Sequence, residues 1–159
     1  MVKKRACVFI SGSGTNLREI IRASRDYSFP VKVCLVVSDN NKAKGIIFAK
    51  KFSIPHICLN TNKYKFEKDI LKKLFEYKID IICLAGFMKI LSKKFIRSFK
   101  RQIINIHPSL LPKYKGLNTF QRALKSNDKL TGCTVHFVNE KLDSGKIIIK
   151  KRVNINKDD

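Results

Sequence analysis

The segment Asn105–Pro112 carries the residues best suited to chemistry on a carbonyl group. It reads Asn-Ile-His-Pro-Ser-Leu-Leu-Pro and follows a short apolar run. Because side chains alternate along a strand, we expect Asn105 and His107 on the same face. An amide N–H can donate to a developing oxyanion, and an imidazole can move a proton. The two prolines, Pro108 and Pro112, are typical of a strand end followed by a stiff loop.

A second candidate is the segment Ser11–Asn16, which reads Ser-Gly-Ser-Gly-Thr-Asn. It lies between an apolar run and an amphipathic stretch. Glycines allow a tight turn with exposed N–H groups, and a helix N-terminus adds partial positive charge, so the segment could hold a phosphate. It lacks the Gly-Lys-Ser/Thr of a nucleoside-triphosphate loop. By itself the motif fits a plain tight turn equally well.

Two further segments matter only if the fold brings them near the first two. Leu84–Leu91 is apolar where a loop should turn polar, so it could line a slot for a flat heterocycle or form a packed corner. Asp143 opens a turn, and beside His107 its carboxylate would stabilise a protonated imidazole. The other histidines, His56 and His136, are expected to be structural.

Alternating short apolar runs and amphipathic stretches predict a Rossmann-like α/β fold, with a mostly parallel twisted sheet and helices on both faces. The expected strands are Ala6–Ile10, Val31–Val37, His56–Leu59, Ile79–Leu84, Gln102–Ile106, Gly132–Asn139 and Lys146–Val153. The expected helices are Asn16–Arg25, Lys42–Lys51, Lys63–Tyr77, Lys93–Phe99 and Thr119–Ser126. In the third helix the residues expected in the core are Phe66, Ile70, Leu71, Leu74 and Phe75. No helix separates the last two strands, so we expect them to form an antiparallel edge pair.

The composition favours a cytoplasmic globular protein. The chain has 159 residues, enough for one domain with a substantial core. Its apolar runs are shorter than the roughly 20 residues of a membrane span, so we expect no membrane contact. The five cysteines form no C-x-x-C pair, which indicates buried, reduced thiols and no metal site.

The net charge of +22 raises the question of nucleic-acid binding. The excess is mostly lysine, and it is spread over nearly every segment instead of forming one stripe. Isoleucine and asparagine are also abundant, and all three residues have A/T-rich codons. We therefore favour a genome-composition effect over nucleic-acid binding, and we expect small anionic substrates whose association is sensitive to salt.

In their order and spacing, four segments together resemble the folate-dependent formyltransferases, and most closely the phosphoribosylglycinamide formyltransferases. They are Ile10–Leu17, Leu84–Leu91, Asn105–Tyr114, and Val135–Val138 with Leu142–Gly145. The resemblance runs from about Ala6 to Val153. It implies one formyltransferase domain over residues 1–159, without the C-terminal helix that is usual in this family, as a monomer or homodimer.

The resemblance also implies a reaction and roles for individual residues. The expected reaction moves the formyl group of the co-substrate 10-formyltetrahydrofolate to the amine of 5-phosphoribosylglycinamide in de novo purine biosynthesis, without a metal. The implied catalytic residues are Asn105, His107 and Asp143. The implied ribonucleotide-binding residues are Gly14, Thr15, Asn16 and Pro108. The implied folate-binding residues are Lys63, Met88, Lys89, Ile90, Leu91, Asn105 and Val138.

Three other interpretations stay open from the sequence. Methionyl-tRNA formyltransferases and formyltetrahydrofolate hydrolases share the implied catalytic trio. The former usually have a second, C-terminal domain and the latter an N-terminal regulatory domain, and we expect neither here. The third is a truncated relic that binds folate or nucleotide without turnover.

Overall fold

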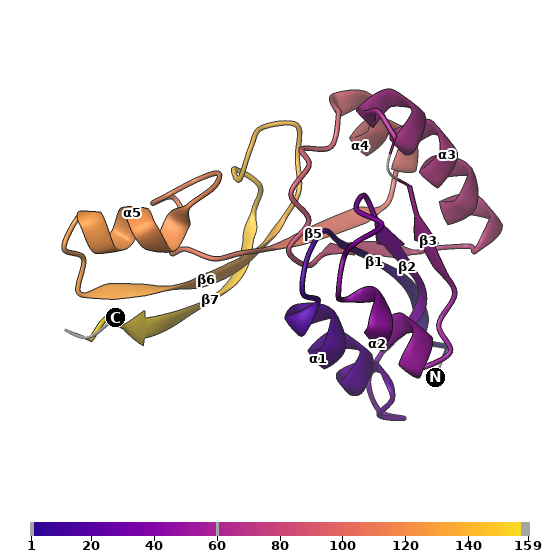
Figure 1. Cartoon of the computed structure of the whole chain (residues 1–159), viewed down its shortest axis with the longest axis horizontal. Helices are drawn as coiled ribbons and strands as arrows, with labels where there is room; N and C mark the ends of the chain where they lie inside the picture. The colour runs from indigo at the N-terminus through magenta and orange to yellow at the C-terminus, as the bar shows by residue number, and fades with distance from the viewer. Residues whose placement is uncertain (1, 60, 157–159) are drawn as a thin grey trace. The chain divides into compact units, whose positions relative to one another are not determined.

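The computed structural model describes residues 2–59 and 61–156. Within these ranges the elements are β1 (Lys4–Ile10), α1 (Thr15–Ser24), β2 (Val31–Ser38), α2 (Ile46–Lys51), β3 (His56–Cys58), α3 (Lys63–Glu76), β4 (Ile81–Leu84), α4 (Lys93–Phe99), β5 (Gln102–His107), α5 (Thr119–Lys125), β6 (Leu130–Phe137) and β7 (Ile147–Asn154) (Figure 1). The strand order is β3-β2-β1-β4-β5-β6-β7. The chain divides into two compact units, Met1–Ile103 and Ile104–Asp159, described separately below.

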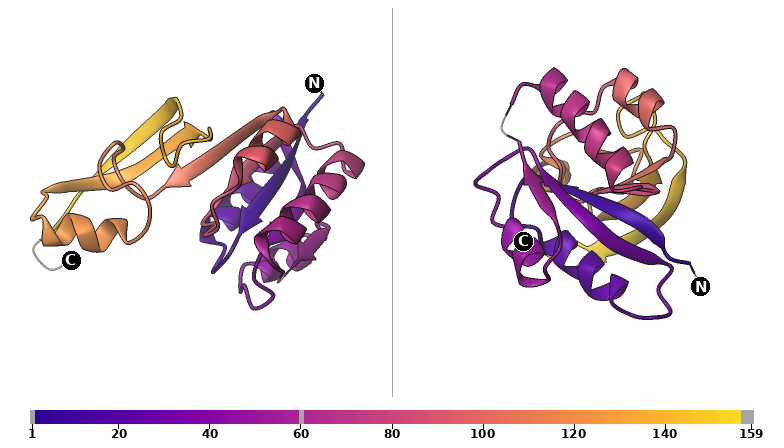
Figure 2. Two further views of the ribbon diagram at one scale, coloured as in Figure 1. Left: turned by 90° about the horizontal axis from the view of Figure 1, so that it is seen from above. Right: turned by 90° about the vertical axis from the view of Figure 1, so that its right-hand side faces the viewer.

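The first unit confirms the predicted α/β architecture. Strand β1 runs parallel to both β2 and β4, and β2 runs parallel to β3. Helices α1 and α2 cover one face of these strands, and α3 and α4 cover the other (Figures 1 and 2). Because both faces are covered, β1 is apolar without alternation, and Ala6 to Ile10 are fully buried.

A cluster of aromatic rings packs α3 and α4 onto the sheet. The ring of Phe9 makes edge contacts with Phe66 and Phe95 at centroid distances of 6.3 Å. Helix α3 buries Phe66, Ile70 and Leu74, which are four residues apart and form one stripe. Phe75 was expected in the core, but it is 58% exposed because it lies a further 100° around the helix. Leu71 was also expected in the core, and it is half-buried.

The second unit contains the antiparallel strand pairs. Strand β6 is antiparallel to β7, as predicted, and it is also antiparallel to β5 although α5 lies between them in the sequence. Strand β6 begins at Leu130, beyond the end of β5. This follows from the register, in which His107, the last residue of β5, pairs with Thr134. The intervening loop and short helix therefore stay at one end of β5 and never cross back to its start.

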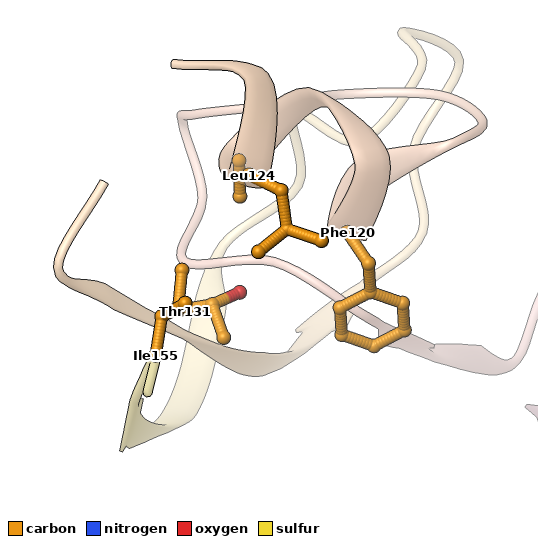
Figure 3. A pocket seen from close by; sticks show the side chains of 5 residues that line it. Phe120, Leu124, Thr131 and Ile155 are labelled. Carbon is orange, nitrogen blue, oxygen red and sulfur yellow. The ribbon is translucent and has the colours of Figure 1, made fainter. Parts of the chain in front are cut away.

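Helix α5 lies beside β6, and its apolar side chains Phe120 and Leu124 are exposed (Figure 3). Phe120 and Leu124 face Thr131 and Ile155 across a shallow apolar pocket of about 230 Å³ (Figure 3). The outer strand β7 is exposed along its whole length. No helix in the described part of the chain is long and apolar enough to cross a membrane.

All five cysteines are free thiols, and Cys7, Cys34 and Cys83 are buried as predicted. Burial raises the pKa of the Cys83 thiol to about 11 and raises that of Cys7 well above its ordinary value. These thiols are protonated at neutral pH, so they behave as small apolar core residues.

The expected helix Lys42–Lys51 is shorter in the structure, because residues 40–45 form a turn. The N–H of Ala43 donates to the carbonyl of Asn40, and that of Gly45 donates to the carbonyl of Gly12. This second bond brings Gly45 directly against Gly14, at the start of α1. The close approach of two backbones explains why neither position carries a side chain.

We predict that Gly45→Ala destabilises the fold by about 1–3 kcal/mol through overpacking. The added methyl carbon would lie 2.7 Å from the Cα of Gly14 and 2.8 Å from the Cδ1 of Ile10. The φ of Gly45 is −61°, so the effect is steric and not conformational. Urea unfolding of this variant measures the loss. Gly12→Ala is the matched control, because nothing lies within 4 Å of its new methyl group, and an equal loss in both variants would contradict the prediction.

Candidate active site

The end of β5 brings the predicted amide and imidazole beside strand β6. Asn105 pairs in register with His136, and His107 pairs with Thr134. The Nδ2 atom of Asn105 lies 3.3 Å from the Nε2 atom of His136. Both Asn105 and His107 are thus placed at the same end of the second unit, two residues apart on one strand.

The carboxylate of Asp143 lies between two imidazole rings. Its Oδ2 atom is 3.5 Å from Nδ1 of His107, and its Oδ1 atom is 3.6 Å from Nε2 of His136. The side chains of His107, His136 and Asp143 are only 6%, 2% and 8% exposed. The structure therefore brings the three residues of the implied catalytic trio together and adds His136 to them.

The loop after β5 fixes the His107 ring and the Asp143 carboxylate. The Nε2–H of His107 donates to the carbonyl of Tyr114 at 2.8 Å, and the N–H of Gly116 donates to Oδ2 of Asp143 at 2.8 Å. A carbonyl only accepts, so Nε2 of His107 carries a hydrogen. The other ring nitrogen faces a carboxylate, and a proton placed there would be shared with Asp143.

His136 was expected to be structural, yet it is in contact with the candidate site. Its Nδ1–H donates to the carbonyl of Phe137 at 2.9 Å, which leaves Nε2 facing Asn105 and Asp143. The adjacent carboxylate of Asp143 raises the pKa of His136, against the opposing effect of burial. An antiparallel β6 places His136 opposite Asn105. The sequence did not reveal this, because a helix precedes β6 and a helix between two strands usually indicates parallel pairing.

The pKa of Asp143 is lowered overall. Burial acts to raise it, but the adjacent His136, the N–H of Gly116 and the nearby His107 outweigh burial. The residue also has a left-handed backbone, with φ of 45°. A buried carboxylate held by several donors in a sparsely populated backbone conformation is typical of a functional site.

Thr134 anchors the segment that contains the two prolines. This fully buried residue donates from Oγ1 to the carbonyl of Ser109 at 2.7 Å and accepts from the N–H of Leu111 at 3.1 Å. The Leu111–Pro112 peptide bond is cis. Pro108 is exposed at the start of this segment, directly after His107.

In the first unit, the predicted phosphate segment forms the start of α1. Gly14 has φ of 74° and precedes the first helical residue, Thr15. The helix has no side-chain cap at this end and no acidic residue in its first turn. Thr15 and Asn16 are exposed, so the unpaired N–H groups of the first turn are open to an anion.

Ser11 joins this segment to the loop after β4. Its hydroxyl donates to Oδ1 of Asp39 at 2.6 Å and accepts from the N–H of Met88 at 2.9 Å. The ammonium group of Lys89 lies 3.8 Å from Oδ2 of the same aspartate. The buried Asp39 thus links the two candidate binding segments of the first unit.

The loop after β4 presents apolar side chains on an aromatic base. Phe87 stacks on Phe66 with ring centroids 5.9 Å apart. Met88 and Ile90 are 62% and 60% exposed, whereas Leu91 is buried. Gly86 has φ of 73°, and nothing lies within 4 Å of a methyl group built on it. This combination of open space and exposed apolar groups fits a flat ligand.

The remaining predicted folate residues lie on separate elements. Lys63 is the exposed first residue of α3, whose N-cap Asn62 accepts from the N–H of Lys65. Val138 is half-buried and follows β6. Across residues 2–59 and 61–156 the structure shows no group of three or more potential metal ligands.

Comparison with known proteins identifies the family. The formyl transferase family matches residues 4–159. The chain belongs to this family. It is 44% identical over 156 residues to the phosphoribosylglycinamide formyltransferase of Haemophilus influenzae, covering 96% of this chain and 74% of that protein.

Two further relatives agree with this assignment. The human trifunctional purine biosynthetic protein adenosine-3 is 40% identical over 161 residues, which cover 99% of this chain but 16% of that longer protein. The crystal structure of phosphoribosylglycinamide formyltransferase from Anaplasma phagocytophilum superposes with a TM-score of 0.91 at 40% identity, covering 98% of this chain and 74% of that one.

We predict that the interaction between Asp143 and His136 stabilises the fold most between about pH 4 and 6.5. The raised pKa of His136 means that its contribution is complete below the ordinary value of 6.5 and is lost as pH rises through the raised value. The lowered pKa of Asp143 means that its contribution is present above 3.8 and is lost as pH falls through the lowered value.

A double-mutant cycle with Asp143→Asn and His136→Gln measures this interaction by urea unfolding. The coupling free energy should be larger at about pH 5.5 than at about pH 9. Equal coupling at the two pH values would show that the pair does not interact as charges.

Proposed function

We propose that this chain transfers the formyl group of 10-formyltetrahydrofolate to the amine of 5-phosphoribosylglycinamide, a step of purine biosynthesis. The observation that carries the proposal is the convergence of Asn105, His107 and Asp143 in a member of the formyl transferase family. Relatives named phosphoribosylglycinamide formyltransferase support this choice of acceptor.

The proposed chemistry is direct transfer. The amine nitrogen bonds to the formyl carbon, the bond from that carbon to N10 of the folate breaks, and the proton lost by the amine ends on N10. Asn105 donates its amide N–H to the oxyanion of the tetrahedral intermediate, and protonated His107 stabilises the same charge. Asp143 positions His107 and balances its positive charge, as the 3.5 Å approach allows.

In this proposal the first unit supplies binding groups for both substrates. The N–H groups of Gly14, Thr15 and Asn16 are assigned to the ribonucleotide phosphate. Pro108 is assigned a further ribonucleotide contact. The apolar groups of Met88, Ile90 and Leu91, with the backbone of Lys89, line the pterin site. Lys63, Asn105 and Val138 complete the folate contacts.

Several accompanying predictions remain to be tested. They are a single domain, a monomeric or homodimeric state, cytoplasmic location, independence from metals and the absence of nucleic-acid binding. A hydrolase, a tRNA formyltransferase and a chain without turnover also remain as outcomes of the assay below, but no specific observation favours any of them.

The test is a formyl-transfer assay that follows tetrahydrofolate release with and without 5-phosphoribosylglycinamide. We expect turnover that depends on the ribonucleotide. Asn105→Ala, His107→Ala and Asp143→Ala should each lower kcat by at least about 10²-fold, because each removes an oxyanion donor or the group that positions it. Circular dichroism should show that each variant is folded.

His56→Ala is the matched control, because His56 is an exposed histidine remote in sequence from the trio. Its turnover should equal that of the unmodified protein. Release of folate without an acceptor would indicate a hydrolase, and formylation of charged initiator tRNA would indicate the sister transferase. Normal turnover in a trio variant would remove that residue from the mechanism.

A further inference from the structure

The buried carboxylate of Asp39 has no role in the reaction proposed above. The residue directly follows the end of β2 at Ser38, and its side chain is only 8% exposed. Burial of a charged group is costly unless the protein supplies partners for it. The partners of Asp39 therefore indicate what this residue does in the fold.

The two oxygens of this carboxylate act on two consecutive residues of the loop after β4. Oδ1 accepts from the hydroxyl of Ser11, and that hydroxyl in turn accepts from the N–H of Met88. Oδ2 lies 3.8 Å from the ammonium nitrogen of Lys89. One side chain at the end of β2 is thus connected to both Met88 and Lys89.

The connection to Met88 depends on the direction in which the Ser11 hydroxyl points. A hydroxyl has one hydrogen and a carboxylate only accepts, so Asp39 fixes that hydrogen toward itself. The lone pairs of the Ser11 oxygen are then left for the N–H of Met88. A side-chain amide at position 39 could donate to the same oxygen, and it would compete with the N–H of Met88.

The loop after β4 needs this support because its other side is open. Met88 and Ile90 are 62% and 60% exposed, and nothing lies within 4 Å of a methyl group built on Gly86. A loop that presents exposed apolar groups to a ligand binds more tightly when it already has its bound conformation. Asp39 therefore acts on the residues for which a fixed position matters most.

The segment between β1 and α1 has other supports. The side-chain amide of Asn40 donates to the carbonyl of Ser11 at 3.1 Å. The N–H of Gly45 donates to the carbonyl of Gly12 at 2.9 Å. These two bonds do not involve the carboxylate of Asp39. We therefore expect the loss of that carboxylate to disturb the loop after β4 more than the segment that precedes α1.

We propose that Asp39 is a positioning residue for the folate co-substrate, and that it acts through Ser11 and Lys89 on the loop assigned to the pterin. The proposal rests on the function proposed above and adds to it a residue that contacts neither substrate. A role through charge alone would have a different signature. Removal of a negative charge near the phosphate segment would tighten ribonucleotide binding, whereas loss of positioning would weaken folate binding.

The variants Asp39→Asn and Ser11→Ala test the proposal in binding and in turnover. Calorimetry gives the Kd for tetrahydrofolate alone and for 5-phosphoribosylglycinamide alone, so neither value depends on formyl transfer. We expect each variant to raise the Kd for tetrahydrofolate and the KM for the formyl donor by about tenfold. Both kcat and the Kd for the ribonucleotide should stay within about twofold, because positioning of the pterin loop affects folate binding and not the chemical step.

The double variant Asp39→Asn/Ser11→Ala tests whether the two residues act in one connection. Because Asp39 reaches Met88 through Ser11, the double variant should bind tetrahydrofolate within about twofold of Asp39→Asn alone. Independent, multiplying effects of the two changes would contradict this connection. Urea unfolding shows whether each variant is folded, and if Asp39→Asn does not fold, Ser11→Ala decides the outcome.

The matched control is Asp26→Asn, which removes the same charge from the turn after α1, where Asp26 accepts from the N–H of Ser28. It should leave both Kd values unchanged. Equal weakening of the two ligands by Asp39→Asn would indicate general disruption and overturn the proposal. Turnover with unchanged tetrahydrofolate affinity in the variants would overturn the role of Asp39 alone. Selective loss of tetrahydrofolate affinity in a protein without turnover would support that role and refute the proposed function.

Discussion

The buried carboxylate of Asp143 is the constraint on which the second unit depends. An isolated buried carboxylate costs several kcal/mol, so it must be surrounded by donors. The structure supplies the N–H of Gly116 and two imidazole rings, from His107 and His136. Meeting this requirement draws together a strand end, a loop and a turn, and it sets His107 and Asp143 of the proposed trio side by side.

The reversal of β6 makes this cluster possible. An antiparallel register sets His136 opposite Asn105 and Thr134 opposite His107. Thr134 can then hold the Ser109–Leu111 loop, which in turn leads to the carbonyl of Tyr114 that orients His107. A parallel strand in the same place would present its side chains in a different register. Strand direction therefore decides which side chains meet in this cluster.

In the first unit, the two loops proposed to bind ligands lie at the carboxyl ends of parallel strands. Ser11 and the buried Asp39 tie the loop after β1 to the loop after β4. Gly14, in the loop after β1, packs closely against Gly45. Phe87, in the loop after β4, packs against the ring of Phe9 in the core. The core itself thus fixes the groups proposed to bind ligands, which would reduce the conformational entropy lost on binding.

The sequence alone determined the element order and the apolar strands, because hydrophobic period and turn residues are local properties. It also predicted the trio, through a family resemblance carried by short motifs. Tertiary structure decided the rest. It placed His136 in the site, exposed Phe75 and engaged Lys89 with Asp39. Each of these outcomes depends on contacts between segments that are distant in the sequence. Strand direction and helix rotation determine these contacts, and the residue types alone do not.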